Sequence, residues 1–160
     1  MEKALDRLKK WNAEALGTPK VCTNVVMYRF FSFSNKRKTG GLGRRGGDLN
    51  GHIGAEVEGY RGAHGGFGYG VRNEEGRSIH EFAIAHDLVV ANSFFKKRDA
   101  QLATFHSGGH STQIDFFLLR RGDLRNCKDC KVLPTWTCSS QHRLLVMELG
   151  TQGRVNRRAR

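Results

Sequence analysis

The sequence predicts an α+β domain, because one amphipathic helix is accompanied by several short apolar strands. The stretch 73–86 (NEEGRSIHEFAIAH) places Ile79, Phe82 and Ala83 at helical spacing, with acidic residues near its start. Further along the chain, short runs rich in β-branched, aromatic and aliphatic residues are typical of strands. These runs are 88–92, 102–106, 113–119, 131–133 and 142–149. We therefore expect a strand-rich C-terminal half.

The N-terminal part differs in amino-acid composition and pattern. Residues 2–16 carry apolar side chains near one helical face, and Gly17 and Pro19 would end that helix. The segment 21–33 is β-branched and aromatic, which predicts one strand or a short buried run. Residues 34–47 (SNKRKTGGLGRRGG) are basic and glycine-rich, with almost nothing to bury, so we expect a flexible loop there.

Length and composition limit the class of protein. A chain of 160 residues suits one domain, and 38% hydrophobic residues suffice for a core. No run approaches the roughly 18 apolar residues of a membrane span, and the N-terminus lacks the apolar region of a secretory signal. Four cysteines in such a chain are expected to be reduced thiols, which favours a nuclear or cytoplasmic location.

The net charge points to the kind of partner. There are 27 Lys and Arg residues against 15 Asp and Glu residues, which gives a formal charge of +12. A field of this sign attracts polyanions and speeds their encounter with the protein. We therefore expect DNA or RNA as a partner and no membrane, although a basic tail alone could account for part of the charge.

Three polar clusters interrupt or end apolar stretches. Asp48 and Asn50, two residues apart, would point to the same side of an extended segment, although Asp-Leu-Asn-Gly is also an ordinary turn sequence. Asp115 lies inside the apolar run QIDFFLL, where a carboxylate needs either an exposed face or a partner such as a histidine. His142 follows Gln141 and leads into an apolar strand. An Asp115–His142 pair requires that their strands be neighbours.

Five ordered segments resemble one family. The sequence from Gly47 to about Leu149 is similar to the second half of the endonuclease/exonuclease/phosphatase superfamily. The matching segments are GDLN (47–50), DLVVANSFF (87–95), ATFHS (103–107), QIDFFLLRR (113–121) and SQHRLLV (140–146). The stretches 64–76 and 127–134 look closest to endonuclease domains of RTE-like LINE retrotransposons and to host proteins of the craniofacial development protein 2-like group.

This resemblance implies a fold and a chemistry. The fold would be a partial two-sheet β-sandwich with flanking helices, and the activity would be phosphodiester cleavage with Mg²⁺ or Mn²⁺. Asp48 matches the carboxylate that orients or deprotonates the attacking water, and Asn50 the amide that steadies the phosphate. His142 matches the histidine that faces the scissile phosphate, and Asp115 the carboxylate that orients it. Asn92 and Thr104 match positions that line the substrate cleft.

The chain also departs from the family pattern. The family has a carboxylate before its histidine, whereas Gln141 offers only a neutral oxygen, so Asp48, Asn50 and Gln141 would form a weak metal site. The N-terminal half of the family fold, with its metal-binding Glu, is missing. We therefore expect weak or absent activity. An uncovered sheet face, through which the chain could self-associate, is also expected.

The expected division of the chain follows from these matches. Residues 1–46 would be a non-family N-terminal helix and basic linker, and residues 47–149 the partial endonuclease/exonuclease/phosphatase domain. Residues 150–160 would be a basic disordered tail. The change of composition near residue 47 suggests that residues 1–46 were joined to a retroelement remnant.

Two other functions remain open on the sequence. The first is a basic nucleic-acid-binding module without catalytic activity, which would bind DNA or RNA but would not nick plasmid DNA. The second is a small zinc site, because Cys127, Cys130, Cys138 and His142 supply four ligands at C-x2-C-x7-C-x3-H spacing. We do not expect zinc, since the second loop is short. Zinc would take His142 out of catalysis.

Overall fold

Two three-stranded antiparallel sheets and one α-helix form the framework of the residues that the structure describes. The structure is a computed structural model, and the described residues are 25–28, 45–137 and 141–150. The strands are β1 (Val25–Tyr28), β2 (Arg45–Asp48), β3 (Leu88–Val90), β4 (Phe105–Ser107), β5 (His110–Thr112), β6 (Asp115–Arg120), β7 (Cys127–Thr137) and β8 (Arg143–Leu149). The helices are α2 (Glu74–Ala85) and the 3-10 turns η1 (Ala91–Phe94), η2 (Asp99–Gln101) and η3 (Arg121–Asn126).

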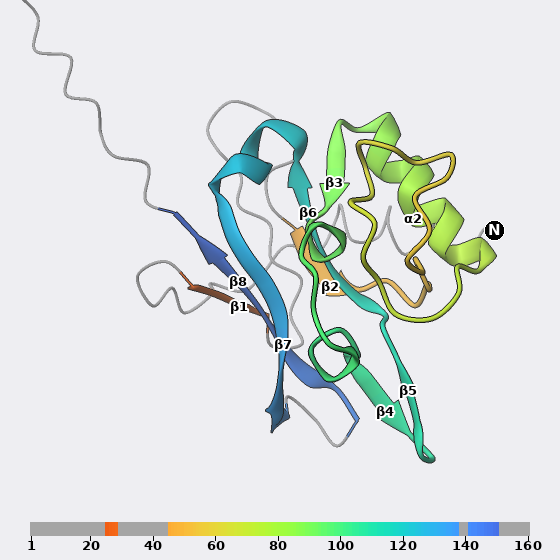
Figure 1. The fold of residues 1–160 in the computed structure, drawn as a ribbon, viewed down its shortest axis with the longest axis vertical. Coiled ribbons are helices and arrows are strands. Elements are labelled where there is room, and N and C mark those ends of the chain that lie inside the picture. The colour runs from red at the N-terminus through yellow and green to blue at the C-terminus, as the bar shows by residue number, and fades with distance from the viewer. Residues whose placement is uncertain (1–24, 29–44, 138–140, 151–160) are drawn as a thin grey trace, which may run out of the picture.

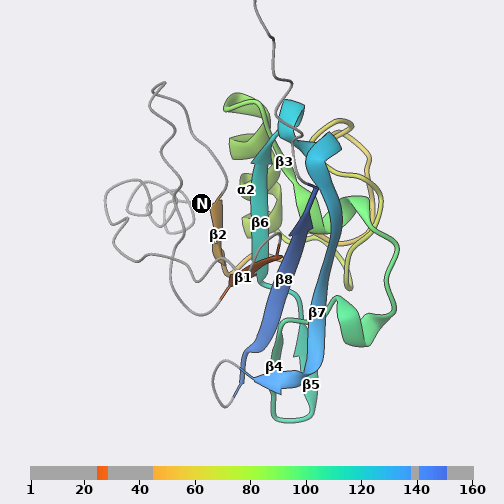
Figure 2. The ribbon, with the colours of Figure 1, turned by 90° about the vertical axis from the view of Figure 1, so that its left-hand side faces the viewer.

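The elements form three layers. One sheet has the order β1-β8-β7 and the other the order β2-β6-β3, while β4 and β5 form a separate hairpin. Figure 1 shows the first sheet on the left, the second in the middle and α2 on the right. The view turned by 90° shows the long strands β7 and β8 beside β6 (Figure 2). The α+β class expected from the sequence is confirmed.

Alternation along β6 supplies both sides of the central sheet with apolar side chains. Phe116 and Leu118 point to one side and pack in a core with Ile79 and Ala83 of α2. Side chains of the intervening residues point to the other sheet, because successive residues of a strand alternate between faces. This second core joins Val89, Ala91, Phe117 and Leu119 to Cys127, Cys130, Val132, Leu145 and Met147. The site described below lies at one end of that second layer.

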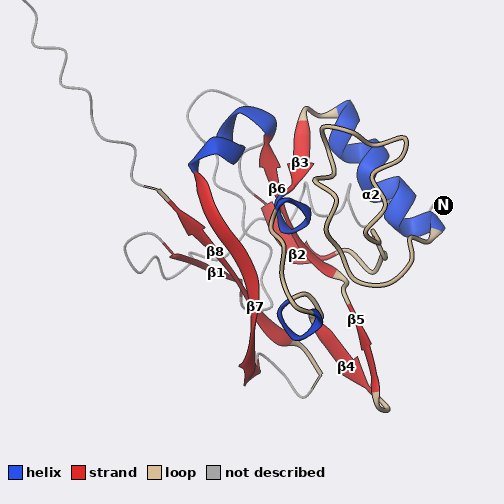
Figure 3. Cartoon of the chain, in the orientation of Figure 1, coloured by secondary structure: helices blue, strands red, loops and turns tan. Residues whose placement is uncertain are grey.

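Helix α2 begins where the sequence predicts it. Asn73 is its N-cap, and the Asn73 side chain accepts hydrogen bonds from the backbone N–H groups of Gly76 and His52, both at 2.9 Å. The second of these bonds ties the long loop that follows β2 to the start of the helix. Gly76 comes so close to this loop that an added Cβ would lie 1.7 Å from the carbonyl oxygen of His52. In Figure 3 the loop residues run around α2 as a tan trace.

The structure corrects one expectation about the entry to Asp48. Residues 45–47 were expected to belong to a flexible loop, but Arg45–Asp48 is a strand that pairs with β6. Gly46 and Gly47 lie opposite Phe117 and Phe116, and both glycines are buried. The buried aromatic residues of β6 supply the apolar side chains of this strand pair, while the facing positions of β2 are glycines. A hydrophobic pattern could not predict this strand.

Other boundaries differ by small amounts. The segment 21–33 contains a strand at Val25–Tyr28, which pairs antiparallel with β8. Within 88–92 the strand ends at Val90 and continues as η1, and the run 131–133 is part of the longer strand β7. The β4–β5 hairpin contains a strand that the apolar pattern did not predict. The predicted helix over 2–16 and the basic tail lie outside the described residues.

The central sheet is covered on both faces. Helix α2 packs against one face and the β1-β8-β7 sheet against the other. The expectation that a missing half would leave a sheet face bare is therefore wrong for this sheet, because a strand from residues 25–28 and the C-terminal strands form the second layer. Within the described residues, no helix has the length and apolar character needed to cross a bilayer.

Candidate functional site

Two carboxylates face each other across neighbouring strands. Asp48 ends β2 and lies directly opposite Asp115, the first residue of β6. Directly opposite side chains in an antiparallel pair project to the same side of the sheet, with Cβ atoms about 4.5–5.5 Å apart. Asp115 shares the face of Phe117, so both carboxylates point toward the layer between the two sheets. The strand register alone therefore brings Asp48 to Asp115.

His142 reaches the same point from the other sheet. Its Nδ1 atom lies 3.1 Å from Oδ2 of Asp115, and both side chains are largely buried, at 11% and 3% exposed. His142 immediately precedes β8 and forms an isolated bridge with Phe105 at the start of β4. The Phe105 ring meets the imidazole edge to face, with centroids 4.9 Å apart. The pairing of Asp115 with His142 that the sequence left conditional is present.

The surroundings of Asp115 shift the pKa of its carboxyl group from the usual value. The pKa of Asp115 is raised to about 6, chiefly by burial, and the nearby Asp48 carboxylate contributes in the same direction. His142 and a hydrogen bond from the Thr104 side chain act in the opposite direction and favour the ionised carboxylate. Asp115 is therefore a carboxylate that needs its histidine partner in order to stay charged in a buried position.

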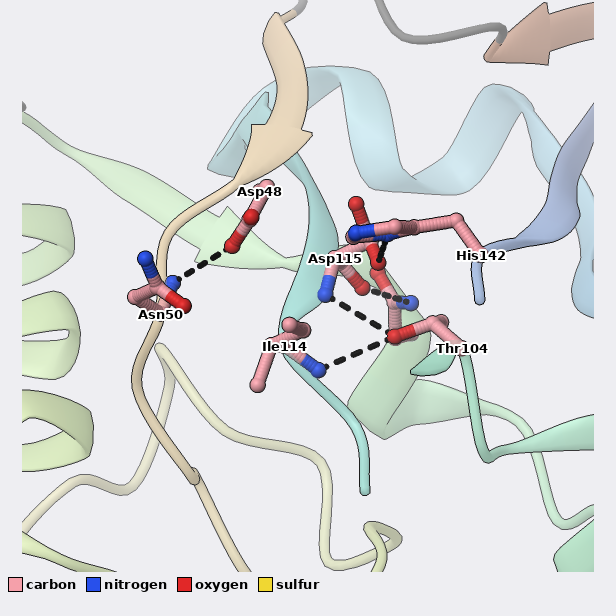
Figure 4. A network of polar contacts seen from close by, with 7 residues as sticks. Asp48, Asn50, Thr104, Ile114, Asp115 and His142 are labelled. Carbon is pink, nitrogen blue, oxygen red and sulfur yellow. Dashed lines mark hydrogen bonds and ion pairs between the residues drawn. The ribbon is translucent and has the colours of Figure 1, made fainter. Parts of the chain in front are cut away.

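Asn50 lies beside Asp48 at the exposed end of the site. The Asn50 backbone N–H donates to Oδ1 of Asp48 at 2.8 Å, and Asn50 has a positive φ of 51°. Asparagine is one of the few residues that adopt this conformation readily. The sharp turn exposes the Asn50 side chain, while the adjacent Leu49 is buried and its N–H donates to the carbonyl of Ile114. Figure 4 shows Asp48 and Asn50 next to the Asp115–His142 pair.

Two further predicted site residues lie underneath the pair. Asn92 in η1 is 3% exposed and Thr104 is 0% exposed. Both side chains bond to the backbone of β6 around Asp115. The expectation that they line a substrate cleft is not met by this burial, because side chains turned into the fold present no surface to a ligand.

Gln141 is exposed, and its side chain is engaged with the neighbouring hairpin. Its Nε2 donates to Oγ of Ser107 at 3.0 Å, and the backbone carbonyl of Gln141 accepts from the backbone N–H of His106. These contacts connect the approach to His142 with the β4–β5 hairpin. The structure thus brings together Asp48, Asn50, Asp115 and His142, and directs the Gln141 amide to the hairpin.

The side-chain oxygens around Asp48 determine how well a divalent cation would fit this site. Among the described residues, no group of three or more His, Cys, Asp or Glu side chains is placed to hold a metal ion. Asp48 supplies a carboxylate and Asn50 an exposed amide, whereas Asp115 is committed to His142. Mg²⁺ is commonly held by one or two carboxylates, with water and substrate phosphate completing its shell. The residues therefore fit Mg²⁺ only together with a phosphate ligand.

The cysteines proposed as zinc ligands have a different position. Cys127 and Cys130 are buried in the apolar core between the two sheets, and burial raises the pKa of the Cys130 thiol well above its usual value. His142, the fourth ligand of that alternative, is bonded to Asp115. Cys138 lies outside the described residues. The two described cysteines thus serve as core side chains, and a zinc site would require both to leave that core.

One residue of the site was not singled out from the sequence. Phe105 covers the imidazole of His142 and limits its exposure to water. The available signal was its position directly after Thr104 in the ATFHS segment. The contact itself could not be inferred, because it depends on the bridge between residues 105 and 142, which are remote in sequence.

Comparison with known proteins finds relatives that match more than half of the chain. The chain is 34% identical over 103 residues to craniofacial development protein 2 of Bos taurus, and equally to craniofacial development protein 2 of Tragulus javanicus. Each match covers 62% of this chain and 17% of the relative, so the chain spans about a sixth of their length. No family model matches the chain. The chain is therefore similar to craniofacial development protein 2 at 34% identity over 62% of its length.

Proposed function

We propose that this chain carries a nucleic-acid phosphodiesterase site of the endonuclease/exonuclease/phosphatase type, descended from a retroelement endonuclease. The observation that carries the proposal is the 3.1 Å contact between Nδ1 of His142 and Oδ2 of Asp115, with Asp48 directly opposite Asp115. Three residues far apart in the sequence meet in this arrangement. The similarity to craniofacial development protein 2 over 62% of the chain supports a common ancestry.

The proposed role of His142 follows from its contact with Asp115. When Nδ1–H donates to Asp115, the ring orientation is fixed and Nε2 is the nitrogen directed away from the carboxylate. With Nδ1 held by the carboxylate, Nε2 can hydrogen-bond to a phosphate oxygen as negative charge develops there. Phe105 limits access of water to the ring, which strengthens this interaction.

Asp48 and Asn50 would act on the opposite side of the phosphate. The Asp48 carboxylate accepts the proton of an attacking water or orients that water, and the Asn50 amide donates to a non-bridging oxygen. Mg²⁺ or Mn²⁺, held by Asp48 and Asn50 with the substrate phosphate, would supply neutralisation of the phosphate charge. Asp48 is the carboxylate that would hold the ion, because Asp115 is bonded to His142, so we expect weak metal affinity and low activity.

Nicking of supercoiled plasmid DNA by the purified chain tests this function. We expect slow conversion to open circles with Mg²⁺ or Mn²⁺, none with EDTA, and loss in both Asp48→Asn and His142→Asn. His86→Asn is the matched control, since His86 is an exposed histidine at the end of α2 in the opposite layer. Nicking that persists in His142→Asn, or that His86→Asn removes equally, would contradict the proposal.

A second candidate is a nucleic-acid-binding module without catalysis. The formal charge of +12 favours this module. Basic side chains that neutralise phosphates release counterions, which favours binding whether or not the site is catalytically active. Binding measured by fluorescence anisotropy should then weaken steeply as the salt concentration rises. Salt-sensitive binding without metal-dependent nicking would select this module over the nuclease.

A further inference from the structure

The strand pairing of β6 has a gap at Asp115. Strand β3 pairs with β6 only at residues 118–120 and ends at Val90, so it does not reach the backbone of Asp115. Here the Asn92 side chain hydrogen-bonds to the backbone of β6 instead. Its Nδ2 donates to the Asp115 carbonyl at 3.3 Å, and its Oδ1 accepts from the N–H of Phe117 at 2.8 Å. One amide side chain therefore replaces two ladder hydrogen bonds of a missing strand.

Thr104 secures the same backbone from another direction. Its Oγ1 accepts from the N–H groups of Ile114 and Asp115, at 3.0 and 3.1 Å. The hydroxyl has one hydrogen of its own, and the Thr104 side chain also hydrogen-bonds to the Asp115 carboxylate. Figure 4 shows Thr104 directly beneath the pair, between Ile114 and His142.

The backbone of Thr104 connects this support to His142. The Thr104 carbonyl accepts from the N–H of Arg143 at 2.8 Å, and the next residue, Phe105, is bridged to His142. A single residue thus fixes the carboxylate through its side chain and the segment carrying the imidazole through its main chain. Asp115 begins β6 and His142 immediately precedes β8, so Thr104 contacts the segments on both sides of the pair.

We propose that Asn92 and Thr104 are positioning residues, which hold Asp115 in register with His142 and do not contact substrate. Their burial, at 3% and 0% exposed, leaves no surface for a ligand. Both side chains use their hydrogen-bonding groups on β6. The role of this positioning in catalysis rests on the proposed nuclease function. The positioning itself is a property of the protein in the absence of nucleic acid.

The first test reads the tautomer of His142 directly, without substrate or metal. We measure ring ¹⁵N chemical shifts at one neutral pH in the parent, in Thr104→Val and in Thr104→Ser. Valine matches threonine in shape but has no hydroxyl, so we expect roughly half or more of the Nδ1–H tautomer to be lost. Serine keeps the hydroxyl and should preserve the parent tautomer. Thr112→Val, on the same hairpin but not bonded to β6 through its side chain, is the matched control.

The second test reads the Asn92 contact by hydrogen exchange. Asn92→Leu removes the acceptor for the Phe117 N–H, so exchange of that amide should accelerate by about tenfold or more. Ser93→Ala is the control, because Ser93 lies in the same turn and bonds to Gly65 and Val90 instead of β6. Unchanged exchange at Phe117 in folded Asn92→Leu would overturn the role of Asn92.

Kinetics separate positioning from substrate contact where nicking is measurable. Misplacement of the pair should lower kcat of Thr104→Val by roughly 100-fold with KM unchanged, and Thr104→Ser should restore most of the activity. A raised KM with unchanged kcat, or an unchanged His142 tautomer in folded Thr104→Val, would overturn the proposal. If the valine variant does not fold, Thr104→Cys provides the same comparison through its weaker hydrogen bonds. A shifted tautomer in a chain that never nicks DNA would refute the nuclease function and leave the positioning intact.

Discussion

Asp48 and Asp115 lie directly opposite each other at the end of the β2–β6 pair, and Asp115 is bonded to His142. Like charges in this arrangement oppose each other, and Asp48 accordingly raises the pKa of Asp115. The histidine and Thr104 oppose that effect. Two chemically identical side chains thus have different environments, because Asp48 is half-buried whereas Asp115 is buried beside an imidazole.

Replacing Asp115 by Asn should uncouple the histidine without disturbing the fold. The amide is close in size and keeps hydrogen bonds to Thr104, but it lacks the charged oxygen that accepts from Nδ1 of His142 and orients the ring. We expect metal-dependent nicking to fall by about 100-fold or more. Plasmid assays beside circular dichroism of the variant measure both properties. Full nicking by folded Asp115→Asn would remove the pair from the mechanism.

A carboxylate at position 141 should strengthen metal binding. Hard divalent cations prefer carboxylate to amide oxygen, so Gln141→Asp should lower the Mg²⁺ concentration that gives half-maximal nicking several-fold. The variant also loses the Nε2 hydrogen bond to Ser107, which frees the side chain to turn from the hairpin. Ser107→Ala breaks that bond without adding a charge and is the matched control. An equal effect of both variants would show that the hairpin contact, and not the new ligand, is responsible.

His80 should make the fold sensitive to acid. This histidine of α2 is fully buried against Tyr60 and His64, and burial lowers its pKa from 6.5 to about 4, with His64 and Arg72 contributing in the same direction. The folded pKa lies below the unfolded one, so the unfolded state binds the proton more readily. The stability is therefore complete above about pH 6.5 and is lost as the pH falls toward 4.

The variant His80→Phe tests this dependence. Urea unfolding at several pH values should show that the parent loses up to about 3 kcal/mol more than the variant between pH 6.5 and 4. Comparing differences in the free energy of unfolding removes the contribution of Asp115, which both proteins retain. His86→Phe replaces an exposed histidine of the same segment. Its free energy of unfolding should show the same pH dependence as that of the parent. Parallel pH profiles for the parent and His80→Phe would contradict the prediction.

Gly76 should tolerate no side chain. A Cβ there would lie 1.7 Å from the carbonyl oxygen of His52, and backbone cannot move aside as a flexible side chain can. Gly76→Ala should therefore lower the free energy of unfolding by about 1–3 kcal/mol or more, measured in urea. Gly122→Ala is the control, because nothing lies within 4 Å of its added Cβ, and we expect a change close to zero there. Similar losses for both would show that the close approach is not limiting.

The sequence predicted helix α2 well because its signals are local. An asparagine cap, acidic residues in the first turn and apolar residues at helical spacing all lie within the helix and its flanks. It also predicted Asp48, Asn50, Asp115 and His142 as a group, through five short ordered segments. The strand at Arg45–Asp48 was missed, because the apolar residues of this strand pair, Phe116 and Phe117, lie on β6 and not on the strand itself.

The amino-acid sequence by itself determined the helix, most of the strand runs, the basic charge and the identity of four polar residues around one site. Only the tertiary structure decided that Asp48 faces Asp115, that His142 approaches from the second sheet, and that Asn92 and Thr104 are buried supports. The physical reason is the range of the interactions. Helical periodicity and capping act within a few residues, whereas strand register and sheet packing join residues such as Asn92, Asp115 and His142 that are separated by more than twenty positions.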